Sequence, residues 1–201
     1  MVERLTGRWR SVFDDVLSGW PAAMGGHRFR FMCWRKRFEA CGRDVFFGDQ
    51  LVISGHSSIR IGDATAFMSR SYLYAHDGGK LFIGSRCSFN HNVLLGAAEG
   101  EILIGDDVLI GPNVVLRAAD HEFGDVERPI RIQRHRPGKI VIGDNVWIAA
   151  NVVVTSNVTI GSGCVVGAGS IVTHDLPPMT VCVGNPARPI RSRSSQSTVS
   201  S

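Results

Sequence analysis

Residues 140–172 read IVIGDNVWIAANVVVTSNVTIGSGCVVGAGSIV, and their aliphatic side chains recur at every sixth position. Those positions are Ile142, Ile148, Val154, Ile160, Val166 and Val172. Glycine or alanine follows most of them, as in Ile142-Gly143 and Ile148-Ala149, which is typical of a tight corner. A second aliphatic often stands two residues earlier, the spacing that puts two side chains on one face of a strand. Each hexad therefore predicts a short strand followed by a turn.

The same period occurs upstream, at Ile104, Ile110 and Leu116, with weaker traces at 59–63 and 81–84. A helix does not explain it, because six residues fit poorly on a 3.6-residue turn and the segments are rich in Val, Ile, Asn and Gly. Three hexads make one triangular coil, and stacked coils bury a continuous aliphatic column. The repeat predicts an all-β chain, a parallel β-helix built as a solenoid from near Val45 to near Val172.

The 201 residues suit one domain with a sizeable core, and 44% hydrophobic against 20% charged residues is an ordinary globular balance. A formal charge of +4 suits a nucleotide cofactor, a nucleic acid or an anionic membrane surface alike. The five scattered cysteines lack a Cys-x-x-Cys pair, and the first twenty residues do not resemble a secretory signal. No apolar run approaches the roughly 18 residues of a membrane span. We expect reduced thiols and a cytoplasmic location.

Composition divides the chain into three parts. Residues 1–44 include the basic, aromatic stretch RFRFMCWRKRFEACGR, and we expect one or two amphipathic helices that cap the open end of the solenoid. The alternative for this cap is a helix lying on a membrane surface, at the inner face of the membrane. Residues 45–191 form the solenoid domain, with a loop at 117–139. Residues 192–201, serine-rich, are expected to be a flexible tail.

The loop interrupts the repeat between Leu116 and Ile140, after which the hexads resume. Long interruptions of a compact scaffold are usually functional or disordered. This one holds Asp120, His121, Glu122 and five arginines. A histidine at the root of such an excursion is held beside a rigid coil and still reaches solvent. His121 is therefore the first candidate for a catalytic residue.

From about residue 50 to 191 the chain resembles the hexapeptide-repeat acyltransferases, and among them the sugar O-acetyltransferases of the galactoside and maltose type and their relatives in polysaccharide biosynthesis. The resemblance rests on an ordered series rather than on any single hexad. The series is IGDDVLIGPNVVLRAADH, the loop, IVIGDNVWIAANVVV, VTIGSGCVVGAGSIVTHDLPP and VGNPARPIR. It implies that the β-helix is left-handed.

The resemblance also implies a reaction. His121 is the general base that takes the proton of an acceptor hydroxyl as the hydroxyl attacks the thioester of acetyl-CoA, in a direct transfer without an acyl-enzyme. Neutral imidazole suits this step because its pKa lies near the operating pH. Asp120, Glu122 or a backbone carbonyl would orient the ring. Asn90, Asn92 and Glu99 stand where the family binds its acceptor, a sugar or saccharide intermediate, although Asn90 and Asn92 are equally turn residues by type.

For the cofactor, the resemblance implies a groove between coils that takes the pantetheine arm of acetyl-CoA, with basic residues near the adenosine phosphates and no required metal. The matching positions are Trp147, Ala150, Ala168, Thr173, Arg188 and Arg191. The family further implies a homotrimer with each site built between two subunits.

Three other functions stay open from the sequence. N-acetylation of an amino sugar or another amine uses the same base. A carbonic-anhydrase-like metal protein on this fold needs a close histidine pair, whereas His121 and His135 are fourteen residues apart. A non-enzymatic scaffold or nucleic-acid-binding protein is suggested by the basic charge, but the loop lacks interleaved aromatic residues, so we expect no nucleic-acid partner.

Overall fold

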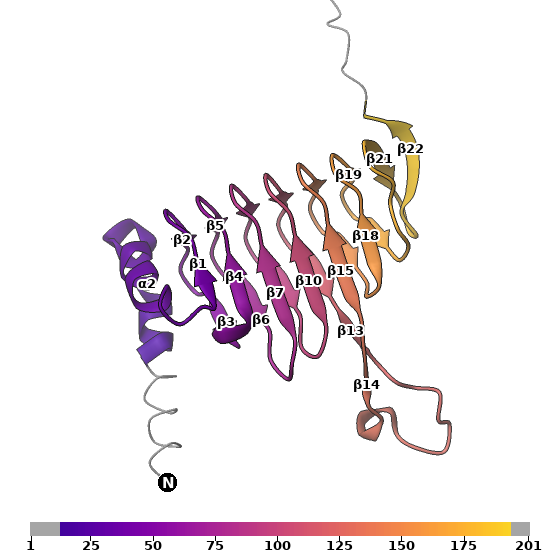
Figure 1. Cartoon of the computed structure of the whole chain (residues 1–201), viewed down its shortest axis with the longest axis horizontal. Coiled ribbons are helices and arrows are strands. Elements are labelled where there is room, and N and C mark those ends of the chain that lie inside the picture. Colours follow the sequence, from indigo (N-terminus) through magenta and orange to yellow (C-terminus); the bar gives the residue numbers. More distant parts are fainter. Residues whose placement is uncertain (1–12, 194–201) are drawn as a thin grey trace, which may run out of the picture.

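The computed structural model describes residues 13–193, and it forms a three-sided solenoid closed at one end by helices (Figure 1). The chain passes in turn through three sheets, here called sheets A, B and C, so that each regular coil adds one strand to each sheet. Pairing between coils is parallel throughout, except between the last two strands of sheet B. The predicted parallel β-helix of hexapeptide repeats is confirmed.

Each sheet consists of very short strands. Sheet A contains β1 (Ala40–Cys41), β4 (Ile59–Ile61), β7 (Lys80–Ile83), β10 (Glu101–Ile104), β15 (Lys139–Ile142) and β18 (Val158–Ile160). Sheet B contains β2 (Phe46–Phe47), β5 (Ala66–Phe67), β8 (Ser88–Phe89), β11 (Leu109–Ile110), β16 (Trp147–Ile148), β19 (Val165–Val166), β21 (Thr180–Val183) and β22 (Arg188–Ser192). Sheet C contains β3 (Val52–Ser54), β6 (Tyr72–Tyr74), β9 (Leu94–Gly96), β12 (Val115–Arg117), β17 (Val153–Val154) and β20 (Ile171–Val172).

The core consists of columns of like side chains, because parallel pairing in register stacks equivalent positions of successive coils. In sheet A, for example, Ile102 pairs with Ile140 and Ile104 with Ile142. All four are buried. The aliphatic residues of the six-residue period are therefore the inward-facing ones, as the sequence predicted.

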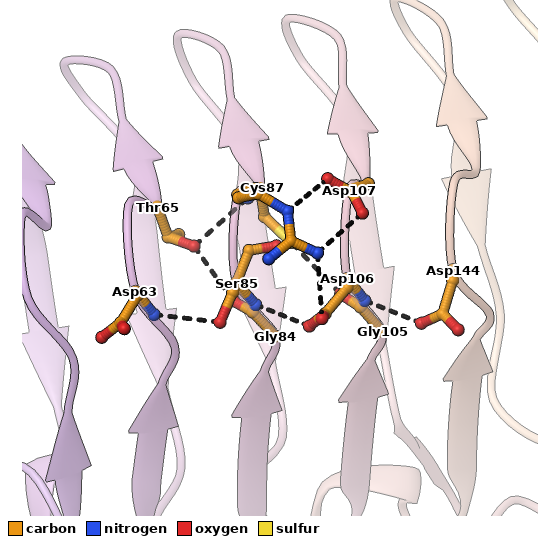
Figure 2. A network of polar contacts seen from close by, with 10 residues as sticks. Asp63, Thr65, Gly84, Ser85, Cys87, Gly105, Asp106, Asp107 and Asp144 are labelled. Carbon is orange, nitrogen blue, oxygen red and sulfur yellow. Dashed lines mark hydrogen bonds and ion pairs between the residues drawn. The ribbon is translucent and has the colours of Figure 1, made fainter.

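The corner between sheets A and B repeats one hydrogen-bonding scheme in successive coils (Figure 2). The backbone N–H of Ser85 donates to Asp106 Oδ1 at 2.8 Å, and that of Asp106 donates to Asp144 Oδ1 at 2.8 Å. The N–H of Asp63 donates to the Ser85 hydroxyl at 3.1 Å. Each corner side chain thus satisfies a backbone donor of the preceding coil, which would otherwise be unpaired.

Glycine before these corner residues is required by close approach between coils. A Cβ added at Gly84 would lie 2.4 Å from the backbone oxygen of Gly105, far inside van der Waals contact. The Ile-Gly-Asp and Ile-Gly-Ser segments of the sequence are therefore corner signals with a steric cause.

Helices cover the first coil, as the cap prediction required. Residues 13–19 are helical, and η1 (Ala22–Met24) and α2 (Gly26–Trp34) follow. The buried Arg30 side chain joins cap and solenoid: its Nε donates to the carbonyl of Phe47 at 2.9 Å, and its Nη1 donates to that of Leu17 at 2.9 Å. Burial lowers the pKa of Arg30. Within residues 13–193, no helix combines the length and the apolar run that crossing a membrane requires.

The strands extend past two of the predicted boundaries. The first strand, β1, begins at Ala40, inside the 1–44 segment assigned to the cap. At the other end, β22 runs antiparallel to β21 and carries the chain to Ser192. Most of the predicted tail, and the first twelve residues of the cap, lie outside the described residues.

Candidate functional site

The interruption of the repeat leaves the solenoid at the corner between sheets C and A, after β12 and before β15 (Figure 1). It begins and ends as an antiparallel hairpin of β13 (Ala119–His121) and β14 (His135–Pro137), and η3 (Ile130–Ile132) lies within it. The register places His121 directly opposite His135. The root of the loop is therefore an ordered piece of sheet that holds the predicted catalytic histidine.

Two histidines and a glutamate form a chain of contacts at this root. The Nε2 atoms of His121 and His135 are 3.3 Å apart, and His135 Nδ1 lies 2.8 Å from Glu99 Oε1. Glu99 belongs to the same corner one coil earlier, between β9 and β10. Glu99 of one coil thus meets the two histidines of the hairpin.

The chemistry of these three groups determines which nitrogen atoms of the two histidines carry a hydrogen. An ionised carboxylate only accepts, so His135 Nδ1 carries a hydrogen and donates it to Glu99. In neutral His135 the Nε2 atom then accepts, and His121 Nε2–H is its donor. Nδ1 of His121 has no hydrogen-bond partner among residues 13–193. The arrangement leaves one basic ring nitrogen of His121 open toward solvent.

The carboxylates next to His121 do not orient it. Asp120 accepts a hydrogen bond from the Ser156 hydroxyl, and Glu122 is exposed, with its backbone N–H donating to the carbonyl of Arg134. Adjacent residues of a strand point to opposite faces, so neither side chain shares a face with His121. The sequence candidates Asp120 and Glu122 were wrong for this role, and the contact belongs to His135.

The loop beyond the hairpin encloses an open hollow of about 1260 Å³ with His121 at its edge. Gln133 holds the loop in shape: its Nε2 donates to the carbonyls of Asp125 and Arg128, each at 2.9 Å. Arg128, Arg134 and Arg136 line the hollow. Three carboxylates, those of Asp120, Glu122 and Asp125, line it as well, so the hollow presents charges of both signs.

The predicted acceptor residues are divided between two corners. Glu99 lies beside His135, but Asn90 and Asn92 lie at the corner between sheets B and C. Asn92 belongs to a ladder there, because its Nδ2 donates to Asn113 Oδ1 at 3.1 Å and Asn113 Nδ2 donates to Asn151 Oδ1 at 2.9 Å. All three ladder residues have φ near +59°, which asparagine tolerates well. Acceptor binding by Asn90 and Asn92 stays a prediction.

Three of the predicted cofactor residues follow sheet B and its corner with sheet C. Trp147 lies on β16 with half of its surface exposed, next to Leu109 on the preceding coil. Ala150 and Ala168 occupy equivalent corners of successive coils, linked by a 2.9 Å hydrogen bond from the Gly169 N–H to the Ala150 carbonyl. Small side chains at both corners leave the backbone accessible. Sheet B is the side of the triangular solenoid opposite the corner that carries His121.

The remaining cofactor candidates lie at the C-terminal end of the solenoid. Thr173 Oγ1 lies 2.8 Å from His174 Nδ1, and Arg188 Nη1 approaches the same nitrogen at 3.5 Å. Arg191 lies on β22 beside Val181, and its side chain is exposed. His174, which the sequence analysis did not select, therefore joins Thr173 to Arg188. The cofactor roles of these residues stay predictions.

His135 is the functional candidate that sequence reasoning missed. Its separation from His121 argued against a close histidine pair, and the hairpin removes that argument. Within residues 13–193, however, no group of three or more His, Cys, Asp or Glu side chains is arranged to hold a metal ion. Only the pairing of the two strands, and no local sequence signal, brings the two rings together.

Comparisons with known proteins agree with this architecture. Residues 139–174 match the family model described as bacterial transferase hexapeptide (six repeats). The galactoside O-acetyltransferase of Escherichia coli is 40% identical over 124 residues, which is 59% of this chain and 57% of that protein. In the first three curated relatives the match spans 52, 62 and 57% of their length, less than two thirds of each.

Two solved structures extend the comparison. A hexapeptide-repeat-containing acetyltransferase from Vibrio cholerae, complexed with acetyl coenzyme A, is 34% identical with a TM-score of 0.58, over 83% of this chain and 78% of that one. A variant of AntD, an N-acyltransferase from Bacillus cereus in complex with dTDP and coenzyme A, is 26% identical with a TM-score of 0.73, over 81% of this chain and 88% of that one.

Proposed function

Because the chain belongs to the hexapeptide-repeat acyltransferase family, we propose that it transfers an acetyl group from acetyl-CoA to a hydroxyl of a sugar or saccharide intermediate. The observation that carries the proposal is the series of contacts Glu99–His135–His121. Nδ1 of His121 has no hydrogen-bond partner among residues 13–193, and His121 lines the loop hollow. Galactoside and polysialic acid O-acetyltransferases among the relatives support a sugar acceptor.

The reaction is a direct transfer with His121 as general base. Its Nδ1 takes the hydroxyl proton while the acceptor oxygen forms a bond to the thioester carbon. The C–S bond then breaks, and the imidazolium returns the proton to the coenzyme A sulfur. While His121 is charged, its Nε2–H donates to His135 and His135 Nδ1–H donates to Glu99. The carboxylate thus stabilises the charge that develops on His121.

We infer that the complete site needs two subunits of a homotrimer. His121 and Trp147 lie on opposite sides of one solenoid, so the expected base and the expected cofactor groove are not adjacent within a single chain. The loop exposes four large apolar side chains, which suits a contact with a neighbouring subunit. They are Phe123, Val126, Ile130 and Ile132.

Release of free thiol from acetyl-CoA, measured against sugars, nucleotide sugars and amino sugars, tests the reaction. We expect acceptor-dependent release that falls on the order of a hundredfold or more in His121→Ala. The matched control is His27→Ala in the cap, which should keep full turnover because His27 contacts the carbonyl of Ala22 and the ring of Phe46 and no residue of the loop. Unchanged turnover in His121→Ala, or no release of thiol with any acceptor of the panel, contradicts the proposal.

An amine acceptor is the second candidate, and the likeness to the N-acyltransferase AntD supports it. The same base serves both reactions, so the panel separates them by product. An acetyl ester on the sugar is cleaved by mild alkali, whereas an acetamide resists it. Products that all resist alkali would replace the hydroxyl acceptor by an amino sugar and leave the role of His121 in place.

Mixing two inactive variants tests the shared site. His121→Ala and Trp147→Ala homotrimers, dissociated and reassembled together, should recover about one quarter of the wild-type sites if each site takes His121 from one subunit and Trp147 from its neighbour. A site within one chain would recover none. Each variant reassembled alone is the control for spontaneous recovery.

A further inference from the structure

The cap carries an apolar surface that the solenoid does not cover. Six large apolar side chains between residues 13 and 32 are exposed, with Met24 at 71% and Met32 at 64%. The set is Phe13, Val16, Trp20, Met24, Phe29 and Met32. Trp20 and Phe29 stack on each other with ring centroids 5.2 Å apart. An exposed patch of this kind marks an interaction site rather than ordinary surface.

Basic side chains share the outward face of α2 with Phe29 and Met32. The inward face is set by Gly26, Arg30 and Trp34, which are buried and recur every four residues. At 100° per residue, Arg28 and Met32 point the opposite way, and Lys36 continues the same row beyond the helix. All three are exposed, as are Phe29 and Arg35.

These cations are free to meet an external anion. Arg28, Arg35 and Lys36 form no ion pair within the described part of the chain, whereas Arg37 is held by Asp14 with 2.6 Å between Nη1 and Oδ2. Asp15 is the only other acidic residue between positions 13 and 37. The outward face is therefore both apolar and positively charged.

The positive charge of the whole chain is concentrated in this segment. Residues 1–37 contain eight Lys and Arg residues against three acidic ones, a formal charge of +5, while the whole chain carries +4. The remaining 164 residues are thus −1 in sum. The net positive charge of the chain therefore comes from its first 37 residues.

We propose that the cap binds the surface of an anionic lipid membrane, with Met32, Phe29 and their apolar neighbours inserted between headgroups and with Arg28, Arg35 and Lys36 against the phosphates. Exposed Lys and Arg side chains beside exposed Trp, Phe and Met suit binding within the membrane interface. A symmetric contact with a second copy would bring the same cations face to face, and a nucleic-acid backbone would leave the apolar side chains in water.

The fold allows this contact without blocking the site. The helices lie across one end of the solenoid, while the loop leaves its side further along (Figure 1). Arg30 donates to the carbonyl of Phe47 and the Trp34 ring packs against that of Phe47, so both side chains anchor α2 to the first coil. The proposal does not depend on the acetyl-transfer reaction.

Sedimentation of the full chain with vesicles tests it. We expect binding to phosphatidylcholine vesicles that contain phosphatidylglycerol, weak binding to phosphatidylcholine alone, and release by salt. Arg28→Gln/Arg35→Gln/Lys36→Gln should lower the partition coefficient about a hundredfold. Arg131→Gln/Arg134→Gln/Arg136→Gln, which removes the same charge from the loop, should leave it near wild type.

A second pair of variants tests the apolar contact. Met32→Ser should lower binding several-fold, roughly the loss of one inserted side chain. Ile190→Ser removes a similarly exposed side chain at the opposite end and should not lower it. Thermal unfolding and light scattering check that each variant folds and keeps its assembly state. The proposal would be overturned if the chain did not bind vesicles, or if cap and control variants had equal effects. It would also be overturned if Met32→Ser gave a smaller assembly with unchanged vesicle binding.

Discussion

Two corners of the same solenoid behave differently. At the corner between sheets A and B, each coil repeats the last, and side chains of one coil satisfy backbone donors of the next (Figure 2). At the corner between sheets C and A, the excursion after β12 brings His121 to His135, and the other ring nitrogen of His121 has no partner in the described part of the chain. The hydrogen bonds of the first corner join neighbouring coils. The open ring nitrogen of the second corner is the feature on which the proposed reaction rests.

The largest effect on stability is expected at the corner between sheets A and B, here called the regular corner. Gly84→Ala places a methyl group 2.4 Å from the backbone oxygen of Gly105, so the two coils must separate. We expect the free energy of unfolding to fall by about 3 kcal/mol or more, measured by urea denaturation. Activity would be lost only because the fold is lost.

The matched variant lies in the loop. Gly124 has open space around it, and Gly124→Ala should change the free energy of unfolding by less than about 0.5 kcal/mol. Equal stability of the two alanine variants would contradict the view that this corner is closed by inter-coil contact.

The second prediction concerns variants at the corner between sheets C and A that leave the protein folded. His135→Ala removes the acceptor for His121 Nε2–H, and we expect turnover to fall about tenfold with an altered pH profile, an unchanged KM for acetyl-CoA and nearly wild-type stability. Glu99→Gln keeps an acceptor for His135 Nδ1 but removes the charge, so a smaller loss of about threefold is expected. Steady-state kinetics over a range of pH measures both.

The double variant decides how Glu99 acts. If Glu99 works through His135, then Glu99→Gln/His135→Ala should be no slower than His135→Ala alone. If Glu99 instead binds the acceptor, as the sequence resemblance implied, the double variant will show a raised KM for the acceptor beyond that of His135→Ala. That outcome would remove Glu99 from the chain to His121.

The smallest effect concerns a thiol in the regular corner. Burial raises the pKa of Cys87 from the ordinary 9.0 to about 11. The folded state holds this proton more tightly than the unfolded state, so its contribution to stability is complete below pH 9 and is lost as pH rises toward about 11. Urea denaturation in reducing buffer should show the free energy of unfolding falling across that window.

Cys87→Ala provides the comparison, because it removes the titrating group at the same buried position. Its stability should fall less steeply between pH 9 and pH 11 than that of the wild type. Parallel curves for the two proteins would show that Cys87 does not titrate differently in the folded state.

The local sequence predicted those features of the fold that follow from the six-residue period alone. The six-residue period gave the strands, the stacked coils and the inward-facing columns, and the break in the period gave the loop with His121 at its root. The structure confirms these features, and the comparisons confirm the resemblance to hexapeptide-repeat acyltransferases. Such predictions succeed because each coil repeats the same local contacts with its neighbours.

The sequence did not predict contacts that depend on which corner a residue occupies or on the register of strand pairing. Asn92 and Glu99 are seven residues apart, yet they lie at different corners, because a short strand of sheet C separates them. His121 and His135 are fourteen residues apart, yet they touch, because the hairpin folds the loop back on itself.

The sequence by itself therefore determined the architecture, the position of the excursion and the candidate base. Only the tertiary structure decided the partner of that base, the separation of His121 from Trp147, and which face of the cap points outward. The physical reason is that a repeated local period specifies burial at each position, whereas meetings between side chains depend on strand register and on the corner that each residue occupies.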